Sequence, residues 1–111
     1  MINCKVYKIR KDKIIEWKSW CEKLNTILRE EALHTLREEG NFLETFFLFE
    51  IDGEYYTIGF GIGEFLPTAK NEKINAIHVQ KKKDCFEKAI HTEELYRLEL
   101  PKKSSVSNIR L

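Results

Sequence analysis

Two polar side chains in this 111-residue sequence have the chemistry and the surroundings of acid–base groups. Glu44 lies in a stretch rich in phenylalanine and leucine, and His78 shares one stripe of a predicted helix with isoleucine and alanine. A carboxylate and an imidazole can exchange protons near neutral pH when burial shifts their pKa values. We therefore treat both as candidate catalytic groups. The structural alternatives are an ion pair of Glu44 with Arg97 and a half-buried, hydrogen-bonded His78.

The histidines do not predict a metal centre. None of the three stands at the H-x-x-x-H or H-x-x-E-H spacing that places ligands on one face of a helix. His34 falls near the end of a predicted helix, where the dipole favours a cation, so a surface or capping role is expected. We keep His34 among the residues that could line a pocket. We expect neither a metal nor another cofactor.

A β-hairpin is the most clearly predicted element of the chain. Two apolar stretches, residues 43–51 and 54–63, flank Asp52 and Gly53, a pair typical of a two-residue type I′ turn. This loop length pairs Phe47 with Ile58 and Glu44 with Gly61. One face of the hairpin is then almost wholly apolar, and we expect helices to cover it as the core.

The second face of the hairpin holds most of the candidate pocket. It combines apolar groups, a carboxylate and glycines, and Trp20 of the preceding helix is placed at the pocket mouth. Glycines inside a strand leave space for Phe46 or for a ligand, and they lack the following helix that a phosphate-binding loop needs. Besides Trp20 and His34, the pocket candidates are Phe46, Tyr55, Gly59 and Gly61.

Alternating and helical patterns on both sides of the hairpin complete the fold. They predict a strand at 4–10, a helix at 13–39 with a bend near 25–26, a helix at 72–90 and a strand at 94–100. The lysines at 81–83 are expected to form a solvated helix face. The order β-α-β-β-α-β is that of an α+β, ferredoxin-like sandwich. We expect one domain at 1–101 and a flexible C-terminal tail at 102–111.

The mixed second face of the hairpin also predicts an oligomer. Large apolar groups on a sheet face that helices leave uncovered would remain in contact with water. Two copies that pair sheet to sheet would bury this face. We therefore expect a homodimer with a barrel-like interior.

The sequence resembles a small bacterial family of unknown function. The resemblance covers residues 4–100, and its most specific part is the segment 30–40 (EEALHTLREEG) together with the hairpin. Trp17, Trp20 and His78 also contribute to it. That family is similar in turn to the dimeric α/β-barrel superfamily, which includes antibiotic-biosynthesis-type monooxygenases and haem-degrading enzymes. The resemblance implies the fold and dimerisation, but no particular reaction.

Composition excludes several classes of function. A net charge of +1 provides no basic surface for nucleic acid, and no apolar stretch is long enough to span a membrane. Three widely spaced cysteines suit free thiols in the cytoplasm. We expect a cytoplasmic homodimer that binds a small, partly apolar molecule beside the sheet. The alternatives are a cofactor-free oxygenase or isomerase that uses Glu44 and His78, and a structural or interaction module.

Overall fold

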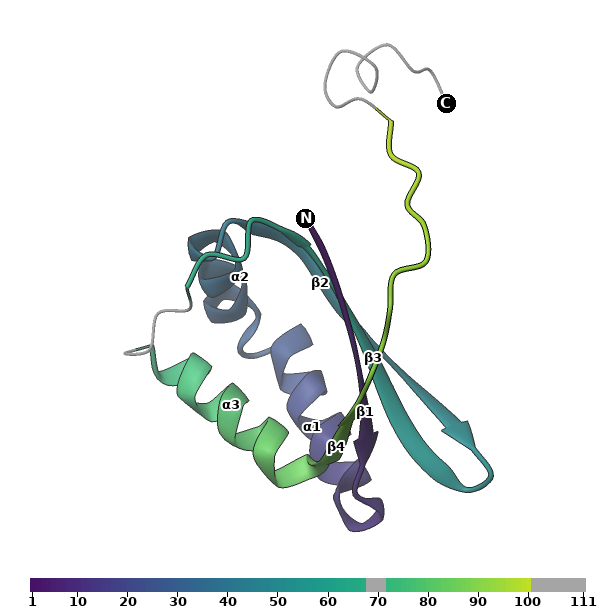
Figure 1. The fold of residues 1–111 in the computed structure, drawn as a ribbon. Coiled ribbons are helices and arrows are strands. Elements are labelled where there is room, and N and C mark those ends of the chain that lie inside the picture. Colours follow the sequence, from purple (N-terminus) through teal and green to yellow (C-terminus); the bar gives the residue numbers. More distant parts are fainter. Residues whose placement is uncertain (68–71, 101–111) are drawn as a thin grey trace, which may run out of the picture.

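The computed structural model describes residues 1–67 and 72–100, in which a four-stranded antiparallel sheet carries three α-helices on one face (Figure 1). The elements follow the order β1 (Ile2–Ile9), the short 3-10 helix η1 (Lys11–Lys13), α1 (Ile14–Asn25), α2 (Arg29–Glu38), β2 (Asn41–Ile51), β3 (Glu54–Gly63), α3 (Lys73–Cys85) and β4 (Phe86–Ile90). The predicted tail at 102–111 lies outside the described residues.

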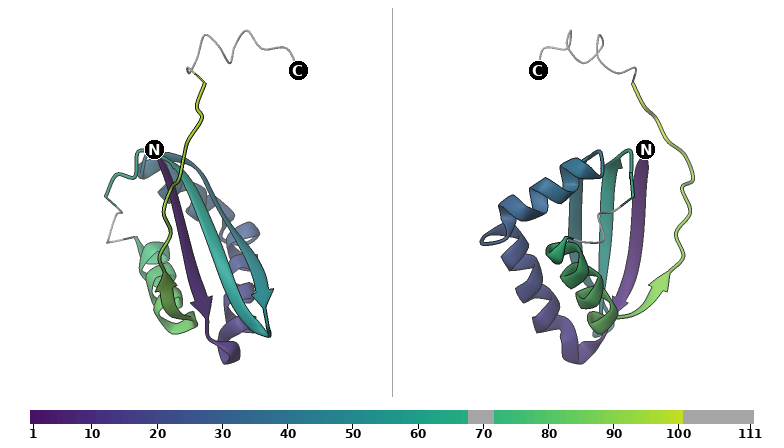
Figure 2. Two further views of the ribbon diagram at one scale, coloured as in Figure 1. Left: turned by 45° about the vertical axis from the view of Figure 1, so that its right-hand side comes forward. Right: turned by 90° about the vertical axis from the view of Figure 1, so that its left-hand side faces the viewer.

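The strand order across the sheet is β2-β3-β1-β4. Each neighbouring pair is antiparallel. Because β3 lies between β1 and β2, these two strands run parallel to each other. Seen along the sheet, the helices form one layer and the strands form another (Figure 2). The molecule is therefore an open sheet with one covered face and one uncovered face.

The predicted hairpin register is confirmed. Phe47 lies opposite Ile58, Glu44 opposite Gly61 and Ile51 opposite Glu54. Asp52 and Gly53 both have positive φ, as a type I′ turn requires. The tight turn thus sets the facing of the side chains from Leu43 to Ile62, and the register shifts only between Asn41 and Leu43.

The prediction of which hairpin face forms the core is wrong. Phe46 and Tyr55, from the mixed face, pack against the buried cluster under the helices. Phe47, from the apolar face, is 56% exposed, and Phe49 stacks on Tyr56 along the same uncovered side. The helices therefore cover the mixed face.

Handedness explains why alternation gave the wrong face. The connection from β1 through α1 and α2 to β2 joins two parallel strands, and such crossovers are almost always right-handed. Once the strand order is set, this rule decides on which side the helices lie. The count of apolar residues on each face does not enter that choice.

The long helix predicted at 13–39 is divided into two helices, and the break lies near 25–26, where a bend was expected. α1 ends at Asn25 and α2 begins at Arg29. Thr26 has φ −125° and ψ −93°, which is not helical, and its backbone N–H donates to the carbonyl oxygen of Lys23. The break lets the second segment turn towards the start of β2.

The predictions for the end of the chain are corrected in two ways. The helix predicted at 72–90 ends at Cys85, and the last strand is β4 at 86–90 instead of 94–100. β4 pairs with β1 so that Ile90 lies opposite Val6. In that register residue 94 falls opposite Ile2, where β1 begins, so most of the predicted strand extends past the sheet.

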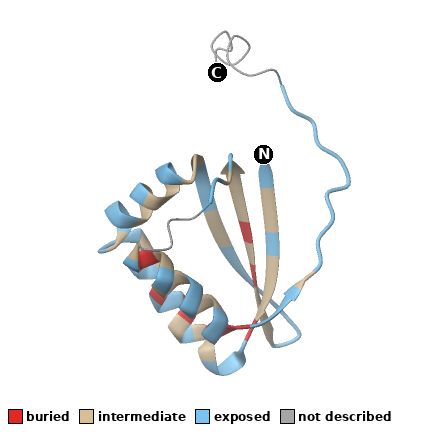
Figure 3. Cartoon of the chain, turned by 60° about the vertical axis from the view of Figure 1, so that its left-hand side comes forward, coloured by how far each residue is buried: buried red, intermediate tan, exposed pale blue. Residues whose placement is uncertain are grey.

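The buried core lies between the helix layer and one end of the sheet (Figure 3). Trp17 is 3% exposed, and its ring lies edge-on to Phe86 at 4.6 Å and to Phe46 at 5.9 Å between centroids. The core residues are Ile9, Trp17, Trp20, Ile74, Cys85 and Phe86. Aromatic rings from α1 thus replace the hairpin residues that the sequence favours as core.

Candidate functional site

A group of ionisable side chains lies between the sheet and α3. We call Lys5, Glu44, His78 and Lys82 the inter-layer cluster. Lys5 of β1 lies opposite Gly59 of β3, and Glu44 of β2 lies opposite Gly61 of β3, so both belong to the helix-covered face. His78 and Lys82 lie one turn apart on α3. Residues from β1, β2 and α3, which are far apart in the sequence, therefore meet at this cluster.

His78 is held by a hydrogen bond from an aromatic neighbour. The Nε1–H of Trp20 donates to Nδ1 of His78 at 2.9 Å. Burial of the imidazole, with a smaller contribution from the charge of Lys82, lowers the pKa of His78 to about 4. The ring is therefore neutral at pH 7, and its remaining proton is on Nε2. In this state His78 can donate a hydrogen bond from Nε2 but is a poor general base.

Glu44 has a raised pKa. Desolvation is the largest cause and the charge of Glu39 adds to it, while Lys82 and Lys5 act in the opposite direction. The side chain keeps contact with solvent, so it can exchange protons. The alternative of an ion pair with Arg97 is wrong, because Arg97 pairs with Glu94 at 3.0 Å and with Glu99 at 3.6 Å.

The sequence did not single out Lys5 or Lys82 of this cluster, and Lys82, expected on a solvated helix face, is half-buried. Partial burial lowers the pKa of Lys82, and the charge of Lys5 lowers it further. Its Nζ atom lies 5.6 Å from the centroid of the Tyr7 ring, within range of a cation–π interaction. The i,i+4 spacing from His78 was a usable signal, because it places both residues on one helix face.

The remaining pocket candidates pack against other residues of the same chain. A Cβ atom on Gly59 would lie 2.5 Å from the Phe46 ring, and one on Gly61 would lie 3.0 Å from the Phe65 ring. The space over both glycines is therefore filled by rings of the same chain. Trp20 is buried and Tyr55 packs against the core.

One depression reaches the edge of the inter-layer cluster. It has a volume of about 250 Å³ and lies along β1 and the end of β4. Lys5 and Tyr7 are among its lining residues, which also include Cys4, Val6, Ala89, Ile90 and Thr92. It gives small molecules an approach to the charged groups from the β4 side of the sheet.

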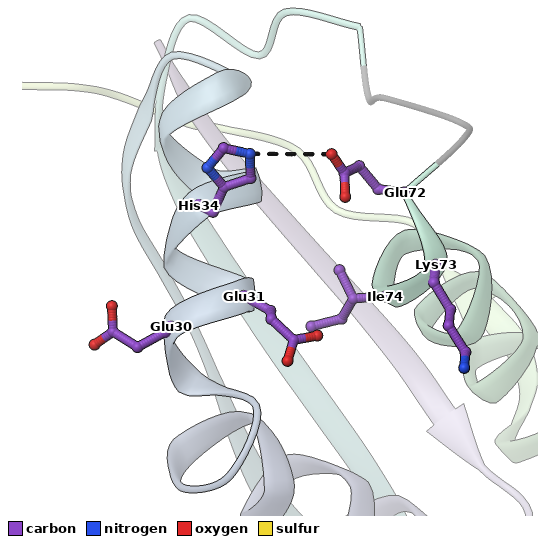
Figure 4. Close-up of a pocket in the computed structure, with 6 residues that line it drawn as sticks. All are labelled: Glu30, Glu31, His34, Glu72, Lys73 and Ile74. Carbon is purple, nitrogen blue, oxygen red and sulfur yellow. Dashed lines mark ion pairs between the residues drawn. The ribbon is translucent and has the colours of Figure 1, made fainter.

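A second depression, of about 260 Å³, surrounds His34 between α2 and the start of α3 (Figure 4). Nε2 of His34 lies 2.8 Å from Oε1 of Glu38 and 4.0 Å from Oε1 of Glu72. An imidazole and two carboxylates are groups that bind divalent cations. Sequence spacing could not show this grouping, because Glu72 joins it only through the fold. His34 is exposed and is already paired within its own helix, so we assign no function to this group.

These features define an α+β protein with one helix layer on an open sheet and a cluster of ionisable groups between the layers. Residues 1–103 match the model of DUF6176, a family of unknown function, and the chain belongs to that family. Comparison with curated proteins found no match, nor did comparison with solved structures. Within the described ranges, no helix is long and apolar enough to cross a membrane.

Proposed function

We propose that this protein is a homodimer that binds a small, partly apolar molecule with a hydrogen-bonding group at the inter-layer cluster. The observation that carries the proposal is the meeting of Glu44, His78 and Lys82 beside aromatic rings, where all three have displaced pKa values. Desolvated charges cost free energy, and such groups gather at functional sites. Three free cysteines suit the cytoplasm of a bacterial cell as the place of action.

The chemistry of the cluster suits a mixed ligand. Tyr7 offers aromatic surface beside the depression, the ammonium of Lys82 offers hydrogen-bond donors, and Glu44 offers an acceptor. His78 adds a donor at Nε2, because its Nδ1 already accepts from Trp20. The depression lined by Lys5 and Tyr7 provides a route for entry.

NMR of the two indole N–H groups tests ligand binding. Small aromatic and aliphatic acids, amides and alcohols are titrated while the Trp20 Nε1–H resonance is followed. We expect at least one compound to shift this resonance, and Lys82→Gln to weaken that binding by about tenfold, as loss of a charge-assisted hydrogen bond should. Lys83→Gln, at the exposed neighbouring position, is the matched control. The proposal fails if no compound shifts Trp20, or if both variants bind like the parent chain.

We propose further that the fold is ferredoxin-like and that two copies pair as a dimeric α/β barrel through the uncovered sheet face. Phe47 and Phe60 meet edge to face on this side, and Ile58 lies between β1 and β2. Lys8, with ion pairs to Glu54 and Glu87, forms a charged border at one end. An apolar centre with a charged rim is the common anatomy of protein interfaces.

The size of the face agrees with a dimer of modest area. Three strands about 4.8 Å apart and about eight residues long present roughly 14 Å by 26 Å of sheet. Side chains raise the accessible area above this projection. Stable interfaces bury about 800 Å² on each partner, so this face supplies a large part of what is needed.

Sedimentation equilibrium tests the dimer. We expect the parent chain and Ile15→Asp to sediment as dimers, and Phe47→Asp to sediment as a 13.2 kDa monomer with unchanged helix content. Ile15 is an exposed apolar residue on α1, away from the sheet, and therefore matches Phe47 as a control. A parent chain that stays monomeric at about 100 µM, above ordinary weak-dimer dissociation constants, contradicts the proposal.

A second candidate function is proton transfer within the same site, as in a cofactor-free isomerase or oxygenase. The specific observation is that the pKa of Glu44 is raised while that of Lys82 is lowered, so both move towards neutral pH. In this version Glu44 is the acid–base group and His78 a neutral hydrogen-bond donor. Exchange of a substrate C–H proton with deuterated water that Glu44→Gln abolishes would favour it over binding alone.

A further inference from the structure

We propose that residues 94–100 form a β-strand that adds to the sheet of a second copy of this chain. We call residues 91–100 the C-terminal arm. The inference rests on the homodimer of the proposed function and specifies how its two subunits are joined. It assigns the arm of each subunit to β2 of the other.

The register of β4 leaves the arm without a place in its own sheet. Ile90 lies opposite Val6, and Thr92 still touches β1 through a hydrogen bond from its Oγ1 to the carbonyl oxygen of Cys4 at 3.1 Å. Continuing this register places residue 94 opposite Ile2, the first residue of β1. Residues 95–100 therefore extend beyond the sheet. Figures 1 and 2 show the arm leaving both layers.

The arm has the pattern of a strand that is covered on one side. Tyr96, Leu98 and Leu100 alternate with Arg97 and Glu99, which form an ion pair at 3.6 Å. Period-two alternation places the three apolar groups on one face of an extended chain. Leu98 is 88% exposed, and Tyr96 and Leu100 are exposed as well. An ordered partner that covers this face would remove a large apolar area from water.

β2 is the edge that fits this strand. It is 11 residues long, against five for β4 at the other edge, and its large side chains Phe42 and Leu48 are exposed. A long, exposed, apolar edge is a template for pairing with another chain. β2 and β4 lie at opposite edges of the sheet, and the arm continues from the β4 edge without pairing with β2 of its own subunit. A second copy supplies the edge, and main-chain hydrogen bonds would join the two subunits.

Arm exchange also supplies interface area that the uncovered sheet face lacks. Seven residues of strand extend for about 23 Å and would pair along most of β2. The apolar side of the arm would then continue the apolar face of the partner's sheet. Each subunit both donates and receives an arm, as a two-fold dimer requires.

Hydrogen exchange of the full chain at two concentrations tests the inference. We expect amides of 94–100 and outward-facing amides of β2 to exchange at least about tenfold more slowly at about 100 µM than at about 1 µM, concentrations that bracket weak-dimer dissociation. Leu98→Asp should abolish the protection of both segments. Glu99→Gln, on the opposite side of the arm, should retain it.

The outcomes separate the two proposals. A dimer in which the arm exchanges as fast as an unfolded peptide overturns arm exchange and leaves the sheet-face dimer standing. A monomer with an unprotected arm overturns both. Protection of the arm in a chain that sediments as a monomer, or protection that survives Leu98→Asp unchanged, places the arm on its own subunit and overturns the inference.

Discussion

His78 and Glu44 respond to the same environment in opposite directions. Burial disfavours the charged form of each group, so it lowers the pKa of the imidazole and raises that of the carboxyl. Folding therefore makes the neutral form of each group more favourable than it is in the unfolded chain. The stability of the protein should depend on pH through each of them separately.

His78 should make the fold weaker in mild acid. Its pKa is near 6.5 in the unfolded chain and about 4 in the fold, so between these values only the unfolded chain binds the proton. The free energy of unfolding should fall as pH drops from about 6.5 to about 4, by up to about 3 kcal/mol. His78→Gln keeps an acceptor for the Trp20 N–H and should lose this dependence. Urea unfolding followed by tryptophan fluorescence at pH 7 and pH 4 measures it. An equal loss in both chains would contradict the assignment.

Glu44 should have the reverse effect. Its pKa is raised in the fold, so protonation favours the folded chain and ionisation at pH 7 opposes it. We expect Glu44→Gln to unfold at a higher urea concentration than the parent at pH 7. The gain should vanish at low pH, where Glu44 is protonated in both states. Glu50→Gln, on the same face of β2 beside the hairpin turn, is the matched control.

At the scale of elements, a contact between β2 and β3 links the sheet to the helix layer. Phe46 lies over Gly59 and edge-on to Trp17, so one ring connects the hairpin to α1. A side chain on Gly59 would occupy the space of that ring. Gly59 and Gly61 thus leave space for aromatic rings of the same chain.

Gly59→Ala should destabilise the fold by overpacking. The added methyl would lie 2.5 Å from the Phe46 ring, which forces the ring or the strand to move. We expect a loss of about 1–3 kcal/mol in the free energy of unfolding. Combining it with Phe46→Leu should cost less than the sum of the two single substitutions, because the smaller side chain leaves room. Strict additivity in a double-mutant cycle would show that the two residues do not interact.

Element by element, local signals predicted some parts of the fold and missed others. The hairpin register followed from Asp52 and Gly53, because a two-residue turn leaves no freedom in pairing. The boundary between α3 and β4 was missed, since helical periodicity in 73–90 shows no break at Cys85. The alternation at 94–100 predicted a strand that the structure does not form, because a pattern does not show whether a neighbouring strand is available.

At the scale of the whole molecule, helices cover one face of the sheet, and the other, largely apolar face is open to solvent. The inter-layer cluster lies within a single chain, so the proposed dimerisation and the proposed ligand binding can be tested separately. Within the described part of the chain, the exposed apolar groups belong largely to the open face and the C-terminal arm.

The melting temperature should rise with protein concentration. In a homodimer, folding is coupled to association, and mass action favours the folded state as concentration increases. We expect a clear upward shift between about 1 µM and about 100 µM for the parent chain, and a much smaller one for Phe47→Asp. Differential scanning calorimetry or circular dichroism measures it. A melting temperature independent of concentration in the parent chain would contradict coupled folding and association.

The sequence by itself determined the α+β class, the hairpin with its register, and the break in the first helix. These depend on turn chemistry and on periodicity over a few neighbouring residues. Only the tertiary structure decided which sheet face the helices cover and which groups surround Glu44 and His78. The hand of the β1-to-β2 crossover and the packing of Trp17 and Trp20 made those choices. The i,i+4 spacing could place Lys82 on one helix face with His78, but only the fold brings these two residues beside Glu44.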